Sequence, residues 1–353
     1  MSAAVTAERV PMFASLGIRN YRLFWTGGLI SNIGTWMARV AQDWLVLTIL
    51  TANSASALGI TTGLQFLPIA LLAPYAGAVA DRIPKRKLLM YTQAAQAAVG
   101  LTLAGLTLAG WVQLWHVYLL AFLLGVAAAF DGPARQAFAP EMVSERLIPN
   151  AVGLNTTSFN GARLIGPAVA GLTIAWWGVG PALLINGLSF IAVLVALMMM
   201  RDAELYPVPF AKRRGAVRDG LRYVRARPDI ILLLFIVFML GTFGMNFQIT
   251  NALMSTAVFH AGAELYGLLG SILAIGSLSA GLLAARRSRL RLRLIIGALA
   301  GFSIAVTGLA LAPGFWWYAF FLVPTGLTAL TVMTTANASV QLATEPVMRG
   351  RVM

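Results

Sequence analysis

The chain has 353 residues, of which 59% are hydrophobic and 11% are charged. A water-soluble fold of this composition would have too little polar surface to cover its core, so a soluble globular protein is excluded. The net charge of +14 does not indicate nucleic-acid binding, because the basic residues occur in short segments spread along the chain. There is no cysteine, and the two histidines, His116 and His260, are far apart, so we expect no disulfide and no metal site.

Long apolar segments recur along the chain at the length that a transmembrane helix needs. About 20 helical residues cross a hydrocarbon core of roughly 30 Å, whereas the strands of a membrane barrel would show alternating segments of about 10 residues. The sequence therefore predicts an all-α integral membrane protein. The ten predicted helices cover residues 22–50, 57–80, 87–110, 114–137, 148–176, 180–200, 229–258, 264–285, 292–312 and 315–342.

The basic residues predict the orientation of these helices. The N-terminal segment and every second loop after it, together with the C-terminal end, contain 24 of the 26 Lys and Arg residues, and the intervening turns contain none. Loops on the cytoplasmic side carry an excess of Lys and Arg, so we expect a cytoplasmic N-terminus. The first residues lack the apolar core and cleavage site of a signal peptide, so we expect the first helix to remain in the cell membrane, the inner one where there are two.

The loop after the second predicted helix contains an ordered run of glycine, acid and base, Gly77-Ala-Val-Ala-Asp81-Arg82-Ile-Pro84-Lys85-Arg86-Lys87. This run resembles the signature of the major facilitator superfamily, although Pro84 stands where that family usually has Gly. The glycine would allow two helices to pack closely, and the resemblance implies a loop that locks two bundles at the inner face. A plain basic loop is the alternative interpretation. The expected gate residues of this loop are Gly77, Asp81, Arg82, Lys85 and Arg86.

A wider resemblance extends along essentially the whole chain. Three segments are similar to the branch of the superfamily that includes the bacterial enterobactin exporter: Gly34-Thr-Trp36-Met-Ala-Arg39-Val-Ala-Gln-Asp43-Trp44, Phe130-Asp131-Gly132-Pro133-Ala134-Arg135 and Arg163-Leu-Ile-Gly166-Pro167. The resemblance implies a secondary transporter with two helical bundles that move around a central site. It favours an exporter of small molecules, such as drugs or siderophore-like metabolites, in exchange for protons.

Other functions remain open at this point. An uptake symporter or a lipid flippase would share the same fold, and a sensor or assembly partner would use it without transport. The sequence contains no Walker motif, no His-Glu-x-x-His and no Gly-x-Ser-x-Gly, so we expect neither ATP hydrolysis nor an enzyme. The expected partners are a small-molecule substrate, protons and membrane lipids, with no cofactor and no nucleic acid, and we expect a monomer.

Charged residues inside predicted membrane helices mark candidate transport residues. Arg39 and Asp43 are four residues apart and share one helix face, and an isolated charge at this depth costs about 3 kcal/mol. We expect Arg39, Asp43 and Arg163 to act in transport or proton coupling. A self-neutralising pair near the outer end of the first helix is the alternative for Arg39 and Asp43. Arg163 needs a partner from another helix, for which Asp131 is one candidate.

Two further groups of residues complete the candidate site. Asp131 and Arg135 repeat the four-residue spacing at the inner end of the fourth predicted helix, and we interpret them as part of the gate. The fifth predicted helix contains Gly161, Gly166, Pro167 and Gly171, and a glycine-rich helix with Gly-Pro resembles a helix-bend motif of antiporters. Ordinary close packing is the alternative for these glycines.

A basic linker divides the chain into unequal parts. The predicted domains are a six-helix bundle over residues 1–201, a cytoplasmic linker over 202–228 and a four-helix bundle over 229–353. The linker forms either an amphipathic helix on the membrane surface or a plain topological anchor. Since the two halves of this fold normally match, we expect twelve helices in the full protein, of which this chain would lack two, or roughly 45 to 60 residues.

The predicted topology can be tested with short tags. A tag at residue 53 or 262 is expected to be accessible only from outside the cell, and a tag at residue 212 only from inside, because the basic loops stay in the cytoplasm. Accessibility of each tag to a membrane-impermeant label in intact and in opened cells measures this. One tag on the opposite side would contradict the topology.

Overall fold

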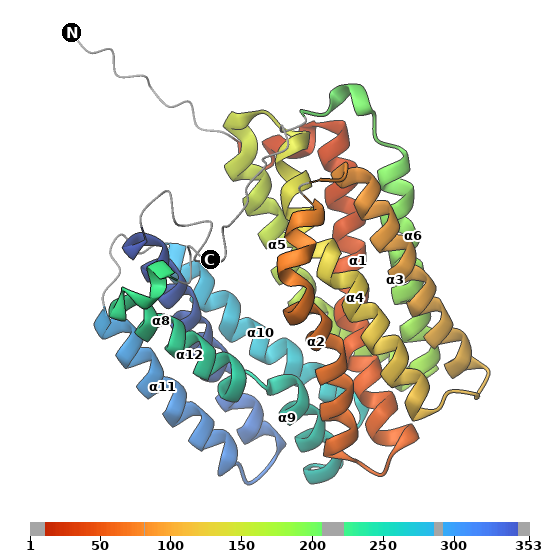
Figure 1. Ribbon diagram of the computed structural model, residues 1–353. Coiled ribbons are helices and arrows are strands. Elements are labelled where there is room, and N and C mark those ends of the chain that lie inside the picture. Colours follow the sequence, from red (N-terminus) through yellow and green to blue (C-terminus); the bar gives the residue numbers. More distant parts are fainter. Residues whose placement is uncertain (1–10, 81, 207–221, 286–291, 345–353) are drawn as a thin grey trace. The chain divides into compact units, whose positions relative to one another are not determined.

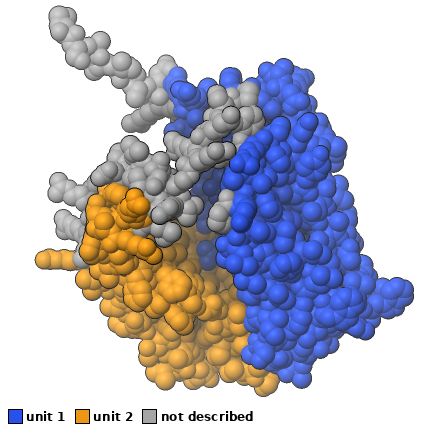
Figure 2. Space-filling view, in the orientation of Figure 1, with its two compact units in different colours: residues 1–166, 173–210 blue, residues 167–172, 211–353 orange. Residues whose placement is uncertain are grey.

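The structure is a computed structural model that describes residues 11–80, 82–206, 222–285 and 292–344. Every regular element in these ranges is helical (Figure 1). The chain divides into two compact units, which Figure 2 distinguishes by colour. The first unit consists of residues 1–166 and 173–210, and the second of residues 167–172 and 211–353. Most of the predicted linker lies outside the described residues, so the predicted domain limits stay a prediction.

The first unit is built on six helices: α1 (Arg19–Trp44), α2 (Ala55–Ala80), α3 (Lys85–Leu108), α4 (Leu114–Phe138), α5 (Ile148–Trp177) and α6 (Val179–Met198). Helix α4 packs against α2 and α3, and α6 packs against α1 and α3. One end of this bundle has a core of large apolar side chains that includes Phe24, Phe138 and Met142. Helix α6 follows α5 directly because Gly178 turns the chain with a φ of 84°, which favours glycine.

The described part of the second unit contains five α-helices: α8 (Pro228–Met239), α9 (Phe247–Leu253), α10 (Ala263–Ala285), α11 (Leu292–Ala310) and α12 (Phe315–Ala343). Helix α12 packs against α8, α10 and α11 and is therefore the centre of this unit. Its residues Val332, Ala336 and Val340 form a core with Ile230 and Ile295.

All ten predicted segments are helical, and two of them differ in detail. The segment predicted over 22–50 ends as a π-helix, Leu45–Leu50, after α1. The segment predicted as one helix over 229–258 is interrupted between α8 and α9, and both halves end in a π-helical turn, Leu240–Gly244 and Met254–Val258. Glycine weakens a helix, and the side-chain amide of Asn246 donates to the carbonyl oxygen of Thr242 at 2.8 Å. Twelve helices, the number that the resemblance implies, remain a prediction.

The surface of the helices is that of a multi-pass membrane protein. Within the described ranges, seven helical segments are long and apolar enough to cross a membrane. Helices α1, α3 and α5 are not among these, since polar and charged side chains lower their mean hydropathy. The Trp residues at three predicted outer turns are all exposed near helix ends, as interfacial anchors require; they are Trp111, Trp115, Trp176, Trp177, Trp316 and Trp317.

Glycines bring pairs of helices into backbone contact in both units. A Cβ added to Gly125 of α4 would overlap the carbonyl oxygen of Gln65 on α2. In the second unit, a Cβ on Gly276 of α10 would overlap the carbonyl oxygen of Val323, and one on Gly326 of α12 that of Leu273. These helix pairs depend on small residues, because association inside a membrane relies on close packing.

Substitution of Gly276 tests this dependence. Gly276→Ala is expected to lower the free energy of unfolding by about 1–3 kcal/mol, since the added methyl group displaces the α12 backbone. Gly281 lies on the same helix with nothing within 4 Å of an added Cβ. Gly281→Ala is therefore expected to be neutral or to stabilise by up to about 1 kcal/mol. Thermal unfolding of both variants in detergent measures the difference, and equal melting temperatures would contradict the packing argument.

Candidate functional site

One group of charged and aromatic side chains surrounds the indole of Trp36 in the first unit. The guanidinium carbon of Arg39 lies 4.6 Å from the centroid of the Trp36 ring and 5.5 Å from that of Phe66 on α2. The guanidinium carbon of Arg163 on α5 lies 5.6 Å from the same indole. Phe159 contacts Trp36 edge to face at 5.8 Å. We call Trp36, Arg39, Phe66, Phe159 and Arg163 the arginine–aromatic cluster.

Helical spacing and one glycine bring this cluster together. Trp36 and Arg39 are three residues apart on α1, and Phe159 and Arg163 are four apart on α5, so each pair shares a helix face. A Cβ added to Gly166 would lie 2.5 Å from the Cβ of Trp36. The absence of a side chain at Gly166 therefore lets the α5 backbone lie directly against Trp36.

The cluster carries more positive than negative charge. Asp43, one turn along α1 from Arg39, is completely buried, and its charge attracts Arg39 while that of Arg163 repels it. The Nε atom of Arg39 is buried and has no hydrogen-bond partner among the described residues. Arg163 likewise forms no ion pair with a carboxylate in the described parts of the chain. Ring contacts therefore hold the two guanidinium groups in place.

A second group surrounds Asp131 on α4. Its carboxylate accepts hydrogen bonds from the Thr92 hydroxyl at 2.8 Å and the Gln93 amide at 2.7 Å, both on α3. The Nε atom of Arg135 lies 3.2 Å from the other carboxylate oxygen. Among the described contacts, the partners of Asp131 are therefore Thr92, Gln93 and Arg135, and its suggested pairing with Arg163 stays a prediction.

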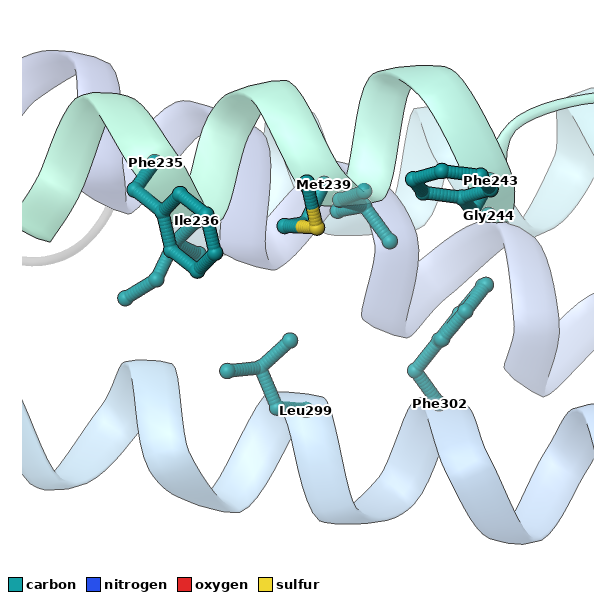
Figure 3. Close-up of a pocket in the computed structure, with 8 residues that line it drawn as sticks. Phe235, Ile236, Met239, Phe243, Gly244, Leu299 and Phe302 are labelled. Carbon is teal, nitrogen blue, oxygen red and sulfur yellow. The ribbon is translucent and has the colours of Figure 1, made fainter.

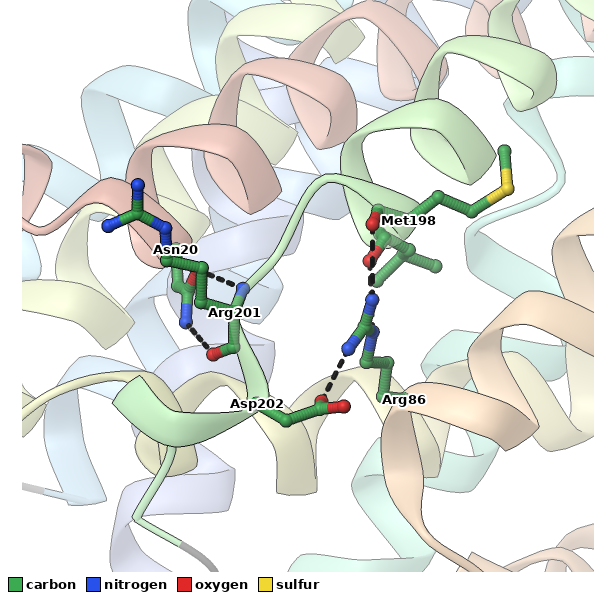
Figure 4. A network of polar contacts seen from close by, with 6 residues as sticks. Asn20, Arg86, Met198, Arg201 and Asp202 are labelled. Atoms are coloured by element: carbon green, nitrogen blue, oxygen red, sulfur yellow. Dashed lines mark hydrogen bonds and ion pairs between the residues drawn. The ribbon is translucent and has the colours of Figure 1, made fainter.

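The basic residues of the signature loop bind within the first unit. Lys85, at the start of α3, forms a buried ion pair of 2.8 Å with Glu141, which follows α4. Arg86 donates to the carbonyl oxygens of Leu197 and Met198 at 2.9 and 3.3 Å and forms an ion pair with Asp202 (Figure 4). The guanidinium group thus binds the carbonyl groups at the end of α6, where helical hydrogen bonding stops.

The structure supports no gate contact for the other residues of this loop within the described part of the chain. Arg82 is exposed, and Asp81 lies outside the described residues. Nothing lies within 4 Å of a Cβ built on Gly77, so this glycine makes no close helix contact within the first unit. The expected close packing occurs instead at Gly125, where α4 meets α2.

The chain that follows α6 is fixed to α1 and to the α4 end by backbone hydrogen bonds. The Asn20 amide donates to the carbonyl oxygen of Arg201 at 2.8 Å, and the Arg201 N–H donates to the Asn20 side-chain oxygen at 3.0 Å (Figure 4). The Tyr206 N–H donates to the carbonyl oxygen of Glu141 at 2.7 Å. Together with Arg86, these bonds join the ends of α1, α3, α4 and α6.

The proposed helix-bend motif lies in a helix without a break. Helix α5 continues through Pro167, which cannot donate a hydrogen bond to the carbonyl of Arg163. Nothing lies within 4 Å of a Cβ built on Gly161. In the second unit, one built on Gly171 would lie 2.6 Å from the carbonyl oxygen of Ala263. Gly166 and Gly171 thus serve close packing, and an antiporter role of the motif stays a prediction.

The second unit contains an apolar cavity of about 360 Å³ between α8 and α11 (Figure 3). Phe235, Met239, Leu299 and Phe302 lie around it. An adjoining cavity of about 270 Å³ beside the helix interruption also presents the polar side chains of Asn246, Thr250 and Tyr318. Within the described residues, no group of three or more His, Asp or Glu side chains could hold a metal ion.

Comparison with known families shows which family this chain belongs to. The transmembrane secretion effector family of the major facilitator superfamily matches residues 10–353. The chain belongs to this family. Its fold and its relatives are those of transporters, which bind small-molecule substrates and are not enzymes.

Individual relatives are distant from this family member. It is 26% identical to the staphyloferrin A transporter of Staphylococcus aureus over 73% of this chain, which corresponds to 65% of that protein. It is 23% identical to macrolide efflux protein A of Streptococcus pyogenes over 93% of this chain and 82% of that protein. With the multidrug efflux pump Tap of Mycobacterium tuberculosis, the identity is 29% over 56% of this chain and 48% of the pump. The match thus spans less than two thirds of the first and third relatives.

Solved structures agree on the fold. A bacterial homolog of the human lysosomal transporter Spinster, in an inward-facing and occupied conformation, gives a TM-score of 0.73 at 15% identity over 95% of this chain and 77% of that one. A D-xylose-proton symporter gives 0.68 at 15% identity, over 95% of this chain and 84% of the other. The low identity means that these structures support the major facilitator fold alone.

Sequence reasoning missed several residues of this candidate site. One of them is Trp36, whose position inside a helix differs from that of the Trp residues at the turns. Its spacing of three residues from Arg39 was the signal that identifies it. Phe66 and Glu141 gave no such signal, because their partners lie on other helices.

The buried ion pair provides a test of the signature loop. Glu141→Leu is expected to lower the free energy of unfolding by about 3–5 kcal/mol, because it leaves the buried Lys85 ammonium without this partner. The double substitution Lys85→Met with Glu141→Leu is expected to restore part of this loss. Thermal unfolding in detergent measures both.

The control is the exposed pair of Arg201 and Glu204, which are three residues apart. Glu204→Gln is expected to change the free energy of unfolding by less than about 1 kcal/mol, because exposed pairs contribute little. A loss for Glu141→Leu as small as that of the control would contradict the structural role of the buried pair.

Proposed function

We propose that this chain is a secondary active exporter that exchanges protons for small molecules, such as drugs or siderophore-like metabolites, across the cell membrane. The observation that carries the proposal is the completely buried Asp43, next to Arg39 on α1, inside a helical unit with an apolar surface. An ionisable group at such a position is expensive and usually functional. The names of macrolide efflux protein A and the multidrug efflux pump Tap favour the outward direction.

Asp43 is proposed to carry the proton. The Asp43 carboxylate is buried and its charge attracts Arg39, so a displacement of Arg39 is proposed to accompany proton binding. Arg163 enters this balance because its charge repels Arg39. Movement of α5 against α1 at Gly166 would change the position of both guanidinium groups around Trp36.

The inner end of the first unit is proposed to be the gate. Asp131 and Arg135 are fixed to α3 through Thr92 and Gln93. The signature-loop residues Lys85 and Arg86 are fixed to Glu141 and to the end of α6. This end would move as one rigid body, as expected for a bundle of residues 1–201 that moves against a bundle of residues 229–353. It would lie on the cytoplasmic side, where the N-terminus is expected.

Removal of the Asp43 charge tests the coupling. Asp43→Asn is expected to reduce transport driven by a pH gradient about tenfold or more while the protein stays folded, because the amide keeps the shape of the carboxylate but takes up no proton. Arg39→Ala is expected to reduce expression as well, because it leaves a buried carboxylate without the charge that stabilises it. Flux of labelled drug candidates in proteoliposomes, with imposed gradients of either sign, measures rate and direction.

The matched control is the exposed Glu204, for which Glu204→Gln is expected to leave flux unchanged. Normal pH-dependent flux in Asp43→Asn would remove Asp43 from the mechanism. Accumulation in the direction of the proton flow would replace export with uptake by a symporter.

A further inference from the structure

We propose that the arginine–aromatic cluster binds the carboxylate of an organic anion, which is the substrate class that this transporter carries. The inference rests on the proposed transport function and specifies its substrate. It starts from two cationic side chains on different helices, Arg39 on α1 and Arg163 on α5, that contact one indole ring.

The charge balance of the cluster favours an anion with a single negative charge. Arg39 and Arg163 are both positive, and Asp43 is the acidic group that acts on Arg39. One carboxylate thus acts on one of two guanidinium groups, and an excess positive charge in an apolar helical unit is unfavourable. Contact with Trp36 reduces this cost, because the ring face is negative, but it does not neutralise the charge. A carboxylate on a ligand would neutralise it.

The hydrogen-bonding capacity of the cluster leads to the same ligand. A guanidinium group has five N–H donors arranged to bind both oxygen atoms of a carboxylate. The Nε atom of Arg39 is buried without a hydrogen-bond partner among the described residues. Buried donors are normally satisfied, so this one indicates a partner other than the described residues. A bidentate acceptor fits this donor better than a point charge does.

The aromatic members indicate that the anion is organic. Phe66 and Phe159 are 41% and 48% exposed although both belong to the cluster. Their rings provide an apolar surface beside the guanidinium groups, which an inorganic anion would not use. A ligand with a carboxylate and an apolar body would contact both parts.

Three probes with the same body separate charge from shape: 1-naphthoate is anionic, 1-naphthamide is neutral and 1-naphthylmethylamine is cationic at pH 7. The purified 353-residue chain in phosphatidylcholine nanodiscs is titrated with each probe by calorimetry. Naphthoate is expected to bind about tenfold or more tightly than naphthamide, since its carboxylate accepts charge-assisted hydrogen bonds. The cationic probe is expected to bind most weakly. Equal affinities, or no binding of naphthoate, would overturn the proposal.

Variants assign the binding to the cluster. Arg39→Gln and Arg163→Gln are each expected to weaken naphthoate binding about tenfold or more and to leave naphthamide binding unchanged. Arg163→Lys keeps the charge and is expected to bind several-fold more weakly, since the bidentate contact is lost. The exposed Arg225 is the control, and Arg225→Gln is expected to bind as the unchanged chain does. If the Gln variants do not fold, unaltered binding by Arg163→Lys would overturn the proposal.

A lipid phosphodiester has the same single negative charge as a carboxylate, so a lipid arm is needed. Naphthoate binding is repeated in nanodiscs that contain phosphatidylglycerol. Unchanged affinity supports a transported solute, and competitive loss of binding would overturn this assignment in favour of a lipid.

The outcome is independent of the export test. Naphthoate binding with no proton-driven efflux would sink the proposed function and leave the anion site in place. Proton-driven efflux with no preference for the anionic probe would overturn the anion site and leave the proposed function in place.

Discussion

The cost of positive charge inside an apolar helical unit is the constraint on which the described structure depends. Arg39 and Arg163 carry this charge, and the indole of Trp36 contacts both of them. This arrangement requires α5 to lie against α1, and Gly166 makes that approach possible. The glycine, the indole and the two arginines are therefore one arrangement, in which packing and electrostatics depend on each other.

The charged side chains of the first unit have two different kinds of partner. At one end, Asp131, Lys85 and Arg86 have ion pairs or carbonyl partners on neighbouring helices, which fix the ends of α3, α4 and α6. Along α1 and α5, ring contacts take the place of acidic partners for Arg163 among the described residues. Satisfied networks give rigidity, whereas charge that is only partly balanced responds to a ligand or a proton. The first kind suits a gate and the second a binding site.

In its described part, the second unit contains two mainly apolar cavities and an interrupted helix. The interruption between α8 and α9 lies beside two adjoining cavities, both of which are lined by Phe243, Gly244 and Phe302. Unwound or π-helical backbone inside membrane proteins is tolerated where it borders a cavity, because polar backbone groups can then be satisfied. The Asn246 amide, which donates to the helix before it, is one such solution.

The sequence by itself determined the all-helical membrane class, the positions of ten helical segments and the superfamily, because segment length, hydropathy and a short ordered motif are local properties of the chain. It also selected Arg39, Asp43 and Arg163, since charge inside an apolar segment is visible without a structure. Only the tertiary structure decided which side chains these residues meet. The contacts of Arg163 with Trp36, of Lys85 with Glu141 and of Asp131 with Thr92 join different helices, and helical spacing carries no information about them.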